Sequence, residues 1–359
     1  MPVEKFSKPS FAVIKNKKSF FEENDKHLSY VLKVNEVYIQ QDKRKKCKNC
    51  DSPISAIDFV SHNVPYFQCE KCSHLNGAYE DSEIFCEFLY TDNDGANYKQ
   101  NYLNQYEGRV KDIYTPKVQF MLEVLEKHID LKDLSVLDVG CGGGHFIKAC
   151  TENNINAFGF EPNLDLVKLG NEKLGENRIE LCSLNDINNL ILKCEHDVIS
   201  MIGVIEHLRY PLEVMQAFKD SKVKYMYLQV PLFSLAVLLE HINQEVFPRQ
   251  LNAGHTHLYT NESLKYLFNE FGIKHIGEWW FGTDMVDLFR QLIVKSKPIN
   301  KDKMGSIIDK YFGAMIDELQ GVLDRKKLCS GVNLILTKKN LNLLPQKKGS
   351  NVKVCYGLS

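Results

Sequence analysis

The sequence predicts an α/β protein with a doubly wound, mostly parallel sheet of seven strands and a small metal-binding domain ahead of it. From residue 134 onward, short apolar runs alternate with amphipathic helical stretches, which is typical of a parallel sheet covered by helices on both faces. One apolar run leads into a glycine-rich loop that opens a helix. Two Cys-x-x-Cys pairs lie upstream, between residues 47 and 72.

Apolar runs and turn residues locate the expected elements. The expected strands of the large sheet are residues 135–140, 156–161, 179–183, 197–204, 224–231, 273–280 and 332–338. Helices are expected from Pro116, a residue suited to a first helical turn, and from His145 to about Asn153. Upstream, Val64 to Gln68 and the alternating segment from Tyr30 to Gln40 are predicted to be strands.

Size and charge limit the functional classes. The chain has 359 residues, 44% hydrophobic and 25% charged, which is typical of a globular protein of about two domains. No apolar run approaches the roughly 20 residues of a membrane span, and the N-terminus lacks an apolar signal core, so a cytoplasmic protein without a membrane partner is expected. The net charge of −1 gives no general attraction for nucleic acid, and the basic run from Lys43 to Lys46 is expected to be a solvated linker.

Composition shifts predict three regions. Residues 1–105 hold the cysteine pairs, residues 106–295 form the nucleotide-binding core with an inserted cap at 232–260, and residues 296–359 hold an amphipathic helix, the last strand and a tail. Within the last region, apolar residues recur at helical spacing from Met304 to Leu323. Such a stripe indicates either core or the surface of a homodimer.

The glycine loop carries the strongest functional signal. It reads Asp138-Val-Gly140-Cys-Gly142-Gly-Gly144-His145. Glycine lets bare backbone approach a ligand, because there is no Cβ in the way. The dinucleotide fingerprint would place its third glycine at position 145, where this chain has histidine.

An acidic residue closes the next expected strand. Glu161 lies 21 positions after Gly140, where a carboxylate can accept hydrogen bonds from both hydroxyls of a ribose. NAD and S-adenosylmethionine (SAM) both carry that ribose, but the loop spacing favours SAM, which has no pyrophosphate. The pattern Asp-x-Gly-x-Gly-x-Gly followed by this acid resembles motif I of the class I SAM-dependent methyltransferases, which have a Rossmann-like core.

The resemblance implies the residues that bind SAM. Asp138, Gly140 and Gly142 would hold the methionine end, with Gly144 completing the loop. Glu161 would bind the ribose. The segment Ser183-Leu-Asn185-Asp186 would border the adenine, with either Asn185 or Asp186 making the polar contact.

Two further segments suggest where an acceptor loses its proton. The fourth expected strand ends in Glu206-His207, which resembles the corresponding motif of these enzymes, and His255, His257 and Tyr259 lie near the end of the cap. A neutral imidazole suits a general base, and His207 ranks first among the three histidines. The alternative is that these histidines only form hydrogen bonds within the fold.

The paired cysteines predict a structural zinc site. Cys47, Cys50, Cys69 and Cys72 form two Cys-x-x-Cys turns that can complete a closed four-thiolate shell, although His74 could replace one thiolate. An odd total of 11 cysteines argues against a disulfide framework. The alternative is a pair of incidental turns in a reduced protein.

A zinc ribbon joined to such a core is similar to the sugar C-methyltransferases that act on nucleotide-linked keto-deoxysugars. This resemblance implies a small-molecule acceptor, a sugar or nucleotide sugar, and no nucleic-acid partner. Two alternatives stay open: an RNA base methyltransferase with a zinc recognition module, and a non-catalytic binding protein that keeps the SAM fold.

Overall fold

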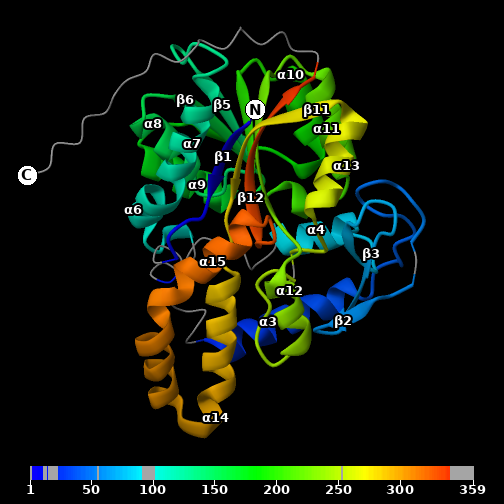
Figure 1. Cartoon of the computed structure of the whole chain (residues 1–359). Coiled ribbons are helices and arrows are strands. Elements are labelled where there is room, and N and C mark those ends of the chain that lie inside the picture. Colours follow the sequence, from blue (N-terminus) through cyan, green and yellow to red (C-terminus); the bar gives the residue numbers. More distant parts are fainter. Residues whose placement is uncertain are drawn as a thin grey trace, which may run out of the picture.

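A computed structural model describes residues 2–10, 14, 23–54, 56–90, 102–251 and 254–339 of the chain. Its centre is an eight-stranded sheet with the order β1-β11-β12-β9-β8-β5-β6-β7 (Figure 1). The strands are β1 (Val3–Phe6), β5 (Ser135–Val139), β6 (Asn156–Glu161), β7 (Ile179–Leu181), β8 (Val198–Ile202), β9 (Tyr225–Pro231), β11 (Ile273–Trp280) and β12 (Gly331–Lys338). Only β12 runs antiparallel to its neighbours within this sheet. This confirms the predicted doubly wound class.

Helices cover both faces of the sheet, as Figure 1 shows. Along β9, Tyr225 and Tyr227 face one core, and Met226 and Leu228 face the other. The helices of the first face are α6 (Tyr106–Arg109), the π-helical turn Val110–Tyr114, α7 (Thr115–Leu125), α8 (His145–Glu152) and α9 (Leu164–Leu174). Those of the second are α10 (Ile187–Lys193), α11 (Pro211–Asp220) and α13 (Asn261–Phe271).

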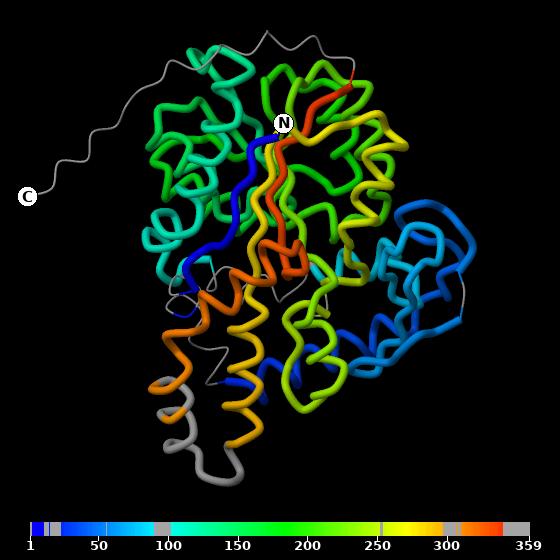
Figure 2. Tube along the Cα trace, viewed as in Figure 1, coloured from blue at the N-terminus to red at the C-terminus, as the bar shows by residue number. Residues whose placement is uncertain are grey.

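All seven predicted strands of the large sheet are present, and an eighth was missed. Strand β1 pairs in parallel with β11, with Val3 opposite Gly277 (Figure 2). A segment as short and polar as Val-Glu-Lys-Phe gives no period-2 signal, and its partner strand lies about 270 residues away in sequence. Tertiary pairing therefore decides its conformation.

The strand predicted from Tyr30 to Gln40 is wrong, because this segment belongs to helix α3 (Asn24–Tyr38). Its buried residues include Val31, Val34, Asn35 and Tyr38. They follow the spacing i, i+3, i+4, i+7 of a helix face, which the apparent apolar–polar alternation obscured.

A second, four-stranded sheet joins the cysteine pairs to the core. Its order is β10-β4-β3-β2, with β2 (Phe59–Ser61), β3 (Val64–Gln68), β4 (Leu75–Gly77) and β10 (His257–Leu258). Strand β3 matches the prediction. Strand β10 comes from the inserted segment 232–260, which also holds α12 (Leu235–Ile242), and it pairs antiparallel with β4. The predicted domain boundaries stay a prediction. Strand β1, from the predicted N-terminal region, pairs in the eight-stranded sheet, and β10, from the predicted core region, pairs in the four-stranded sheet.

The remaining helices are α4 (Glu83–Tyr90), α14 (Asp284–Phe312) and α15 (Ile316–Arg325), and short 3-10 turns span Leu184–Asp186, Ile205–His207 and Gly313–Met315. Helix α14 extends away from the large sheet, and α15 leads back toward it (Figure 1). The predicted helix Met304–Leu323 is thus interrupted at Gly313–Met315. Among the described residues, no helix is both long and apolar enough to cross a membrane.

Candidate functional site

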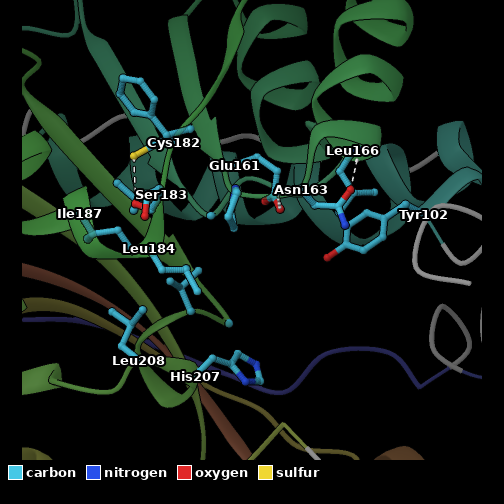
Figure 3. Close-up of a pocket in the computed structure, with 16 residues that line it drawn as sticks. Tyr102, Glu161, Asn163, Leu166, Cys182, Ser183, Leu184, Ile187, His207 and Leu208 are labelled. Carbon is cyan, nitrogen blue, oxygen red and sulfur yellow. Dashed lines mark hydrogen bonds between the residues drawn. The ribbon is translucent and has the colours of Figure 1, made fainter. Parts of the chain in front are cut away.

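A pocket lies at the carboxyl edge of β5, β6 and β8, where open parallel sheets bind their ligands (Figure 3). It is lined by Tyr102, Val139, Gly140, Phe160, Glu161, Pro162, Asn163, Leu166, Cys182, Ser183, Leu184, Ile187, Gly203, Val204, His207 and Leu208. A second hollow continues from it toward α4 and α11 and shares several of these residues. Two predicted cofactor contacts, Gly140 and Glu161, and the candidate base His207 therefore line one cavity.

The glycine loop turns sharply at the floor of the pocket. Gly140, Gly142 and Gly144 have φ angles of 68°, 55° and 75°, a region that other residues rarely adopt. A Cβ on Gly140 would lie 2.8 Å from Val204 Cγ2, and one on Gly142 would lie 2.5 Å from the ring of Tyr102. Glycine at these positions is therefore required by the backbone conformation and by the side chains packed on the loop.

Glu161 is preset to receive a ligand. Its Oε2 accepts a hydrogen bond from the N–H of Gly142 at 2.8 Å, and its Oε1 accepts one from the N–H of Asn163 at 3.1 Å. Burial raises the pKa of this carboxyl to about 7. Each carboxylate oxygen can accept a further bond, so the side chain can hold ribose hydroxyls without reorienting.

Asp138 lies deeper than the ligand contacts around it. Its Oδ1 accepts a hydrogen bond of 2.6 Å from Ser200 Oγ on the neighbouring strand β8, and the residue is 3% exposed. Burial raises its pKa to about 7, although Ser200 and Lys117 act in the opposite direction. Asp138 does not line the pocket, so its predicted role at the methionine end stays a prediction.

The expected adenine border lies at the other end of the pocket. Ser183, Leu184 and Ile187 line it, and Ser183 Oγ accepts a hydrogen bond from the N–H of Asn185. Asn185 Nδ2 donates to Glu83 Oε1 on α4 at 2.9 Å. Neither Asn185 nor Asp186 lines this pocket, and Asn185 reaches only the adjoining hollow.

His207 lies at the pocket wall directly after β8. Its Nδ1 is 2.8 Å from the carbonyl oxygen of Gly254. Because a carbonyl can only accept, Nδ1 carries the proton and Nε2 the lone pair. Burial lowers the pKa of His207 to about 4, so the ring is neutral at physiological pH.

His255 has the same arrangement. Its Nδ1 is 2.7 Å from the carbonyl oxygen of Gln250, and its ring centroid is 4.9 Å from that of His207. One ligand atom each of Glu206, His207 and His255 lies within 4.8 Å of the others. Burial raises the pKa of Glu206 to about 8. These three predicted residues are brought together.

His257 and Tyr259 are buried behind the pocket rather than in its wall. His257 Nδ1 is 2.8 Å from Nε2 of His74, and Tyr259 packs edge-on against His74. Among the described residues, His257 Nε2 and Tyr259 Oη have no hydrogen-bond partner. Both residues therefore contact the second cysteine turn, which the sequence did not indicate.

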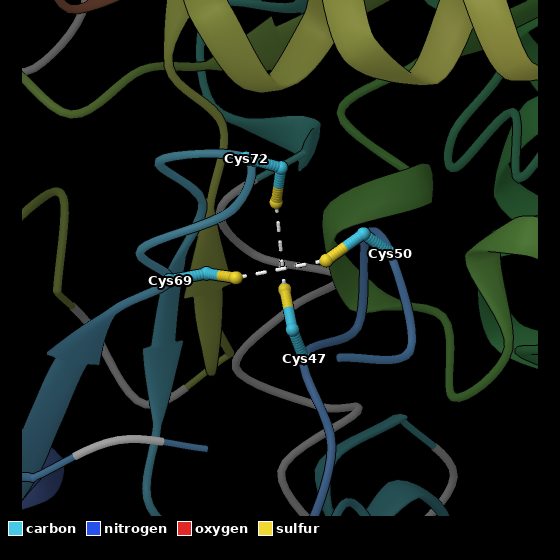
Figure 4. A group of neighbouring side chains, drawn as sticks. All are labelled: Cys47, Cys50, Cys69 and Cys72. Atoms are coloured by element: carbon cyan, nitrogen blue, oxygen red, sulfur yellow. Dashed lines mark hydrogen bonds between the residues drawn. The ribbon is translucent and has the colours of Figure 1, made fainter. Parts of the chain in front are cut away.

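The four predicted cysteine ligands converge on one point (Figure 4). The Cys47 and Cys72 sulfurs are 3.7 Å apart, and those of Cys50 and Cys69 are 3.6 Å apart. A tetrahedral shell with zinc–sulfur bonds of about 2.3 Å would place sulfurs about 3.8 Å apart. The backbone N–H of Asn49 also donates to the Cys47 sulfur at 3.4 Å. The donor set and its spacing fit a structural zinc ion.

Strand order and glycine loop together define the class of protein. Among the described strands of the large sheet, only β12, between β11 and β9, is antiparallel, and a glycine loop follows β5; this is the class I SAM-dependent methyltransferase fold. Residues 106–277 match the family model described as a methyltransferase domain. The chain is therefore an enzyme of this class, as its motifs predicted.

Individual relatives are distant. A tRNA U34 carboxymethyltransferase of Desulfotalea psychrophila is 31% identical over 103 residues, which are 27% of this chain and 32% of that protein. The chain thus spans about a third of the length of this relative. Among solved structures, a SAM-dependent methyltransferase of Archaeoglobus fulgidus is 19% identical with a TM-score of 0.38, covering 62% of this chain and 94% of that one. The magnesium protoporphyrin IX methyltransferase of Synechocystis is 11% identical with a TM-score of 0.45, covering 71% and 98%.

The sequence reasoning missed several residues of the site. Tyr102 packs on the glycine loop, and Ser200 holds Asp138. Arg44 belongs to the basic run that was expected to be a solvated linker, but it is only 6% exposed, and the nearby Lys48 is 7% exposed. No local motif marks them, because each owes its position to a partner distant in sequence.

Proposed function

We propose that this chain methylates a small polyhydroxylated acceptor, a sugar or nucleotide sugar, with SAM as methyl donor and His207 as the general base. The observation that carries the proposal is the position of His207: it lines the same pocket as Gly140 and Glu161, and its Nε2 carries the lone pair. When bound, SAM supplies an electrophilic methyl group on sulfur.

The residues of the pocket divide the remaining work. Glu161 would hold the ribose hydroxyls, the glycine loop would hold the methionine end, and the apolar side chains of Leu184 and Ile187 would border the adenine. Nε2 of His207 would accept the proton that the acceptor loses. Such base assistance contributes about 10²–10⁴-fold, and positioning contributes the rest.

We also propose that Cys47, Cys50, Cys69 and Cys72 bind one structural zinc ion. Four thiolates leave no open position for a substrate, so the ion would organise the ribbon and take no part in the chemistry. Metal analysis of the purified chain is expected to give one zinc per molecule. Replacement of Cys69 by serine should lower that ratio, whereas replacement of the buried Cys194 should not.

An RNA acceptor is the second candidate, favoured by the 31% identity with a tRNA-modifying enzyme over 103 residues. The net charge of −1 counts against it, because RNA-binding surfaces attract phosphates with clustered basic residues. No described feature supplies such a cluster at the pocket, whose second hollow is lined by Glu83, Glu87 and Glu213 against Arg209.

One experiment separates these acceptors. The chain is incubated with methyl-labelled SAM and, in parallel, with nucleotide sugars, free sugars and tRNA, and the labelled product is identified by mass spectrometry. Label in a sugar is expected. Label in tRNA alone would replace the proposal by the second candidate, and absence of SAM binding by calorimetry would favour a non-catalytic protein.

A further inference from the structure

A buried lysine connects the first cysteine turn to the wall of the pocket. Lys48 lies between Cys47 and Cys50, and its ammonium donates a hydrogen bond of 2.8 Å to the carbonyl oxygen of Leu208. Leu208 lines the pocket and directly follows His207. The contact joins residues 160 positions apart in the sequence. It links the first cysteine turn to the turn that follows β8 of the large sheet.

The backbone of Lys48 is fixed by the same ribbon. Its N–H donates to Asn76 Oδ1 at 2.9 Å, and the amide of Asn76 donates to the Cys47 sulfur at 3.5 Å. Asn76 lies on β4, opposite His257 of β10. The backbone of Lys48 is thus held by the first cysteine turn and β4.

Burial of an ammonium group is costly unless it is paired. Lys48 forms an ion pair with Asp81, which also pairs with Arg44 at 3.2 Å. Both cations and the carboxylate are almost fully buried. Two cations share one carboxylate, because Arg44 also pairs with Asp81. The ammonium of Lys48 therefore has two partners, Asp81 and the carbonyl oxygen of Leu208.

The second cysteine turn holds the opposite side of the histidine pair. His74, two positions after Cys72, contacts His257 at 2.8 Å, and β10 pairs with β4. His255, two residues before His257, packs against the ring of His207. The turn that bears His207 and the strand next to His255 are therefore both anchored to cysteine turns.

We propose that the cysteine ribbon positions the reacting histidine: Lys48 fixes the turn Ile205–His207 through the Leu208 carbonyl, and His74 fixes the strand that follows His255. This inference rests on the proposed function for the role of His207, but the geometry itself is testable without an acceptor. Lys48 is a positioning residue, since it does not itself line the pocket and acts through Leu208.

The test measures the tautomer of His207. In uniformly ¹⁵N-labelled chain at pH 7.5, long-range ¹H–¹⁵N spectra report which ring nitrogen carries the proton, and the signals of His207 are assigned by their loss in His207→Asn. The wild-type ring is expected to carry its proton on Nδ1. Lys48→Met should give a mixture of both tautomers. Once the acceptor is identified, this variant should also have a 10- to 100-fold lower kcat at an unchanged Kd for S-adenosylhomocysteine. That decrease corresponds roughly to the loss of one charged hydrogen bond.

Two variants and one treatment complete the test. Lys48→Arg can still reach both partners and should keep the Nδ1 tautomer, and Lys45→Met, at an exposed position of the same segment, should match the wild type. Removal of zinc from the wild-type chain with a chelator should shift the His207 signals in step with metal release. Unchanged His207 signals in Lys48→Met would overturn the proposal. If that variant does not fold, unchanged His207 signals after zinc release from the wild-type chain would overturn it.

A failure of the proposed function gives a different result. If His207→Asn retains full turnover, His207 is not the base, but the tautomer measurements still decide whether the ribbon positions it. The two proposals can thus fail separately.

Discussion

Glu161 and Gly142 are joined by a hydrogen bond of 2.8 Å from the backbone N–H of the glycine to Oε2 of the carboxylate. This bond ties the end of β6 to the loop that follows β5. The two parts of the expected nucleotide site, the acid and the glycine loop, are therefore one connected unit before any ligand binds. A ligand that contacts both does not have to bring them together, which lowers the entropic cost of binding.

Replacement of Glu161 by glutamine should weaken binding of S-adenosylhomocysteine about 10- to 100-fold, because a hydrogen bond to a charged group contributes about 1.5–3 kcal/mol. Isothermal titration calorimetry measures the change. Glu180→Gln is the matched control, since Glu180 is an exposed residue on β7 beside Phe160. Equal affinity in Glu161→Gln and the control would remove Glu161 from the ligand site.

Gly140→Ala should lower both stability and affinity for the nucleoside. Its φ of 68° costs a Cβ-bearing residue roughly 1–2 kcal/mol, and the new methyl would lie 2.8 Å from Val204 Cγ2. Gly175 has a φ of 75° with no atom within 4 Å of its Cβ position, so Gly175→Ala isolates the backbone strain. Urea unfolding should show a larger loss for Gly140→Ala, and only that variant should bind the ligand more weakly.

A double variant checks the cause. If the clash with Val204 is responsible, Val204→Ala should recover part of the lost stability in the Gly140→Ala background. Identical losses in Gly140→Ala and Gly175→Ala would instead mean that the loop relaxes away from Val204.

The sequence contained enough to locate the central sheet and most of the nucleotide site. Buried parallel strands are continuous apolar runs, and the loop from Asp138 to Gly144 must be glycine-rich to adopt its φ angles. Contacts between the ribbon and the core were not predictable. The bond from Lys48 to Leu208 and the contact of His74 with His257 join residues 160 and 183 positions apart, and neither pair follows a local period.

Burial also changes what a motif means. Asp138 belongs to the glycine-loop motif and Tyr259 lies near the candidate histidines in sequence, yet both are buried and do not line the pocket. A single sequence indicates residue type and spacing, whereas depth depends on how neighbouring strands and the ribbon pack. Functional assignment of such residues therefore needs the packed structure.

His207→Asn should lower kcat about 10²–10⁴-fold and leave the Kd for S-adenosylhomocysteine unchanged. Asparagine can still donate to the Gly254 carbonyl, so the turn should keep its shape while the base is lost. The acceptor identified by methyl labelling serves as substrate. His275→Asn, on β11 and away from the pocket, is the control, and turnover equal to the control would exclude His207 as the base.

Stability should fall as the pH rises from about 6.5 to 8.5. Burial raises the pKa of Asp138 and Glu161 to about 7 and that of Glu206 to about 8, whereas the same groups titrate near pH 4 in the unfolded chain. In this window the folded chain holds protons that the unfolded chain has lost, so deprotonation favours unfolding. The buried histidines, whose pKa values are lowered, oppose the trend only at the acidic end of this window, because histidines of the unfolded chain are largely neutral above about pH 7.5.

Glu206→Gln isolates one contribution to this slope. Glutamine cannot ionise, so the free energy of unfolding of this variant should fall by about 2 kcal/mol less than that of the wild type between pH 6.5 and 8.5. Urea unfolding at several pH values measures the slope, with Glu195→Gln, at an exposed position, as the control. A slope as steep in Glu206→Gln as in the control would mean that the Glu206 carboxyl is already ionised at neutral pH. In that case an anion beside His207 would stabilise its imidazolium form.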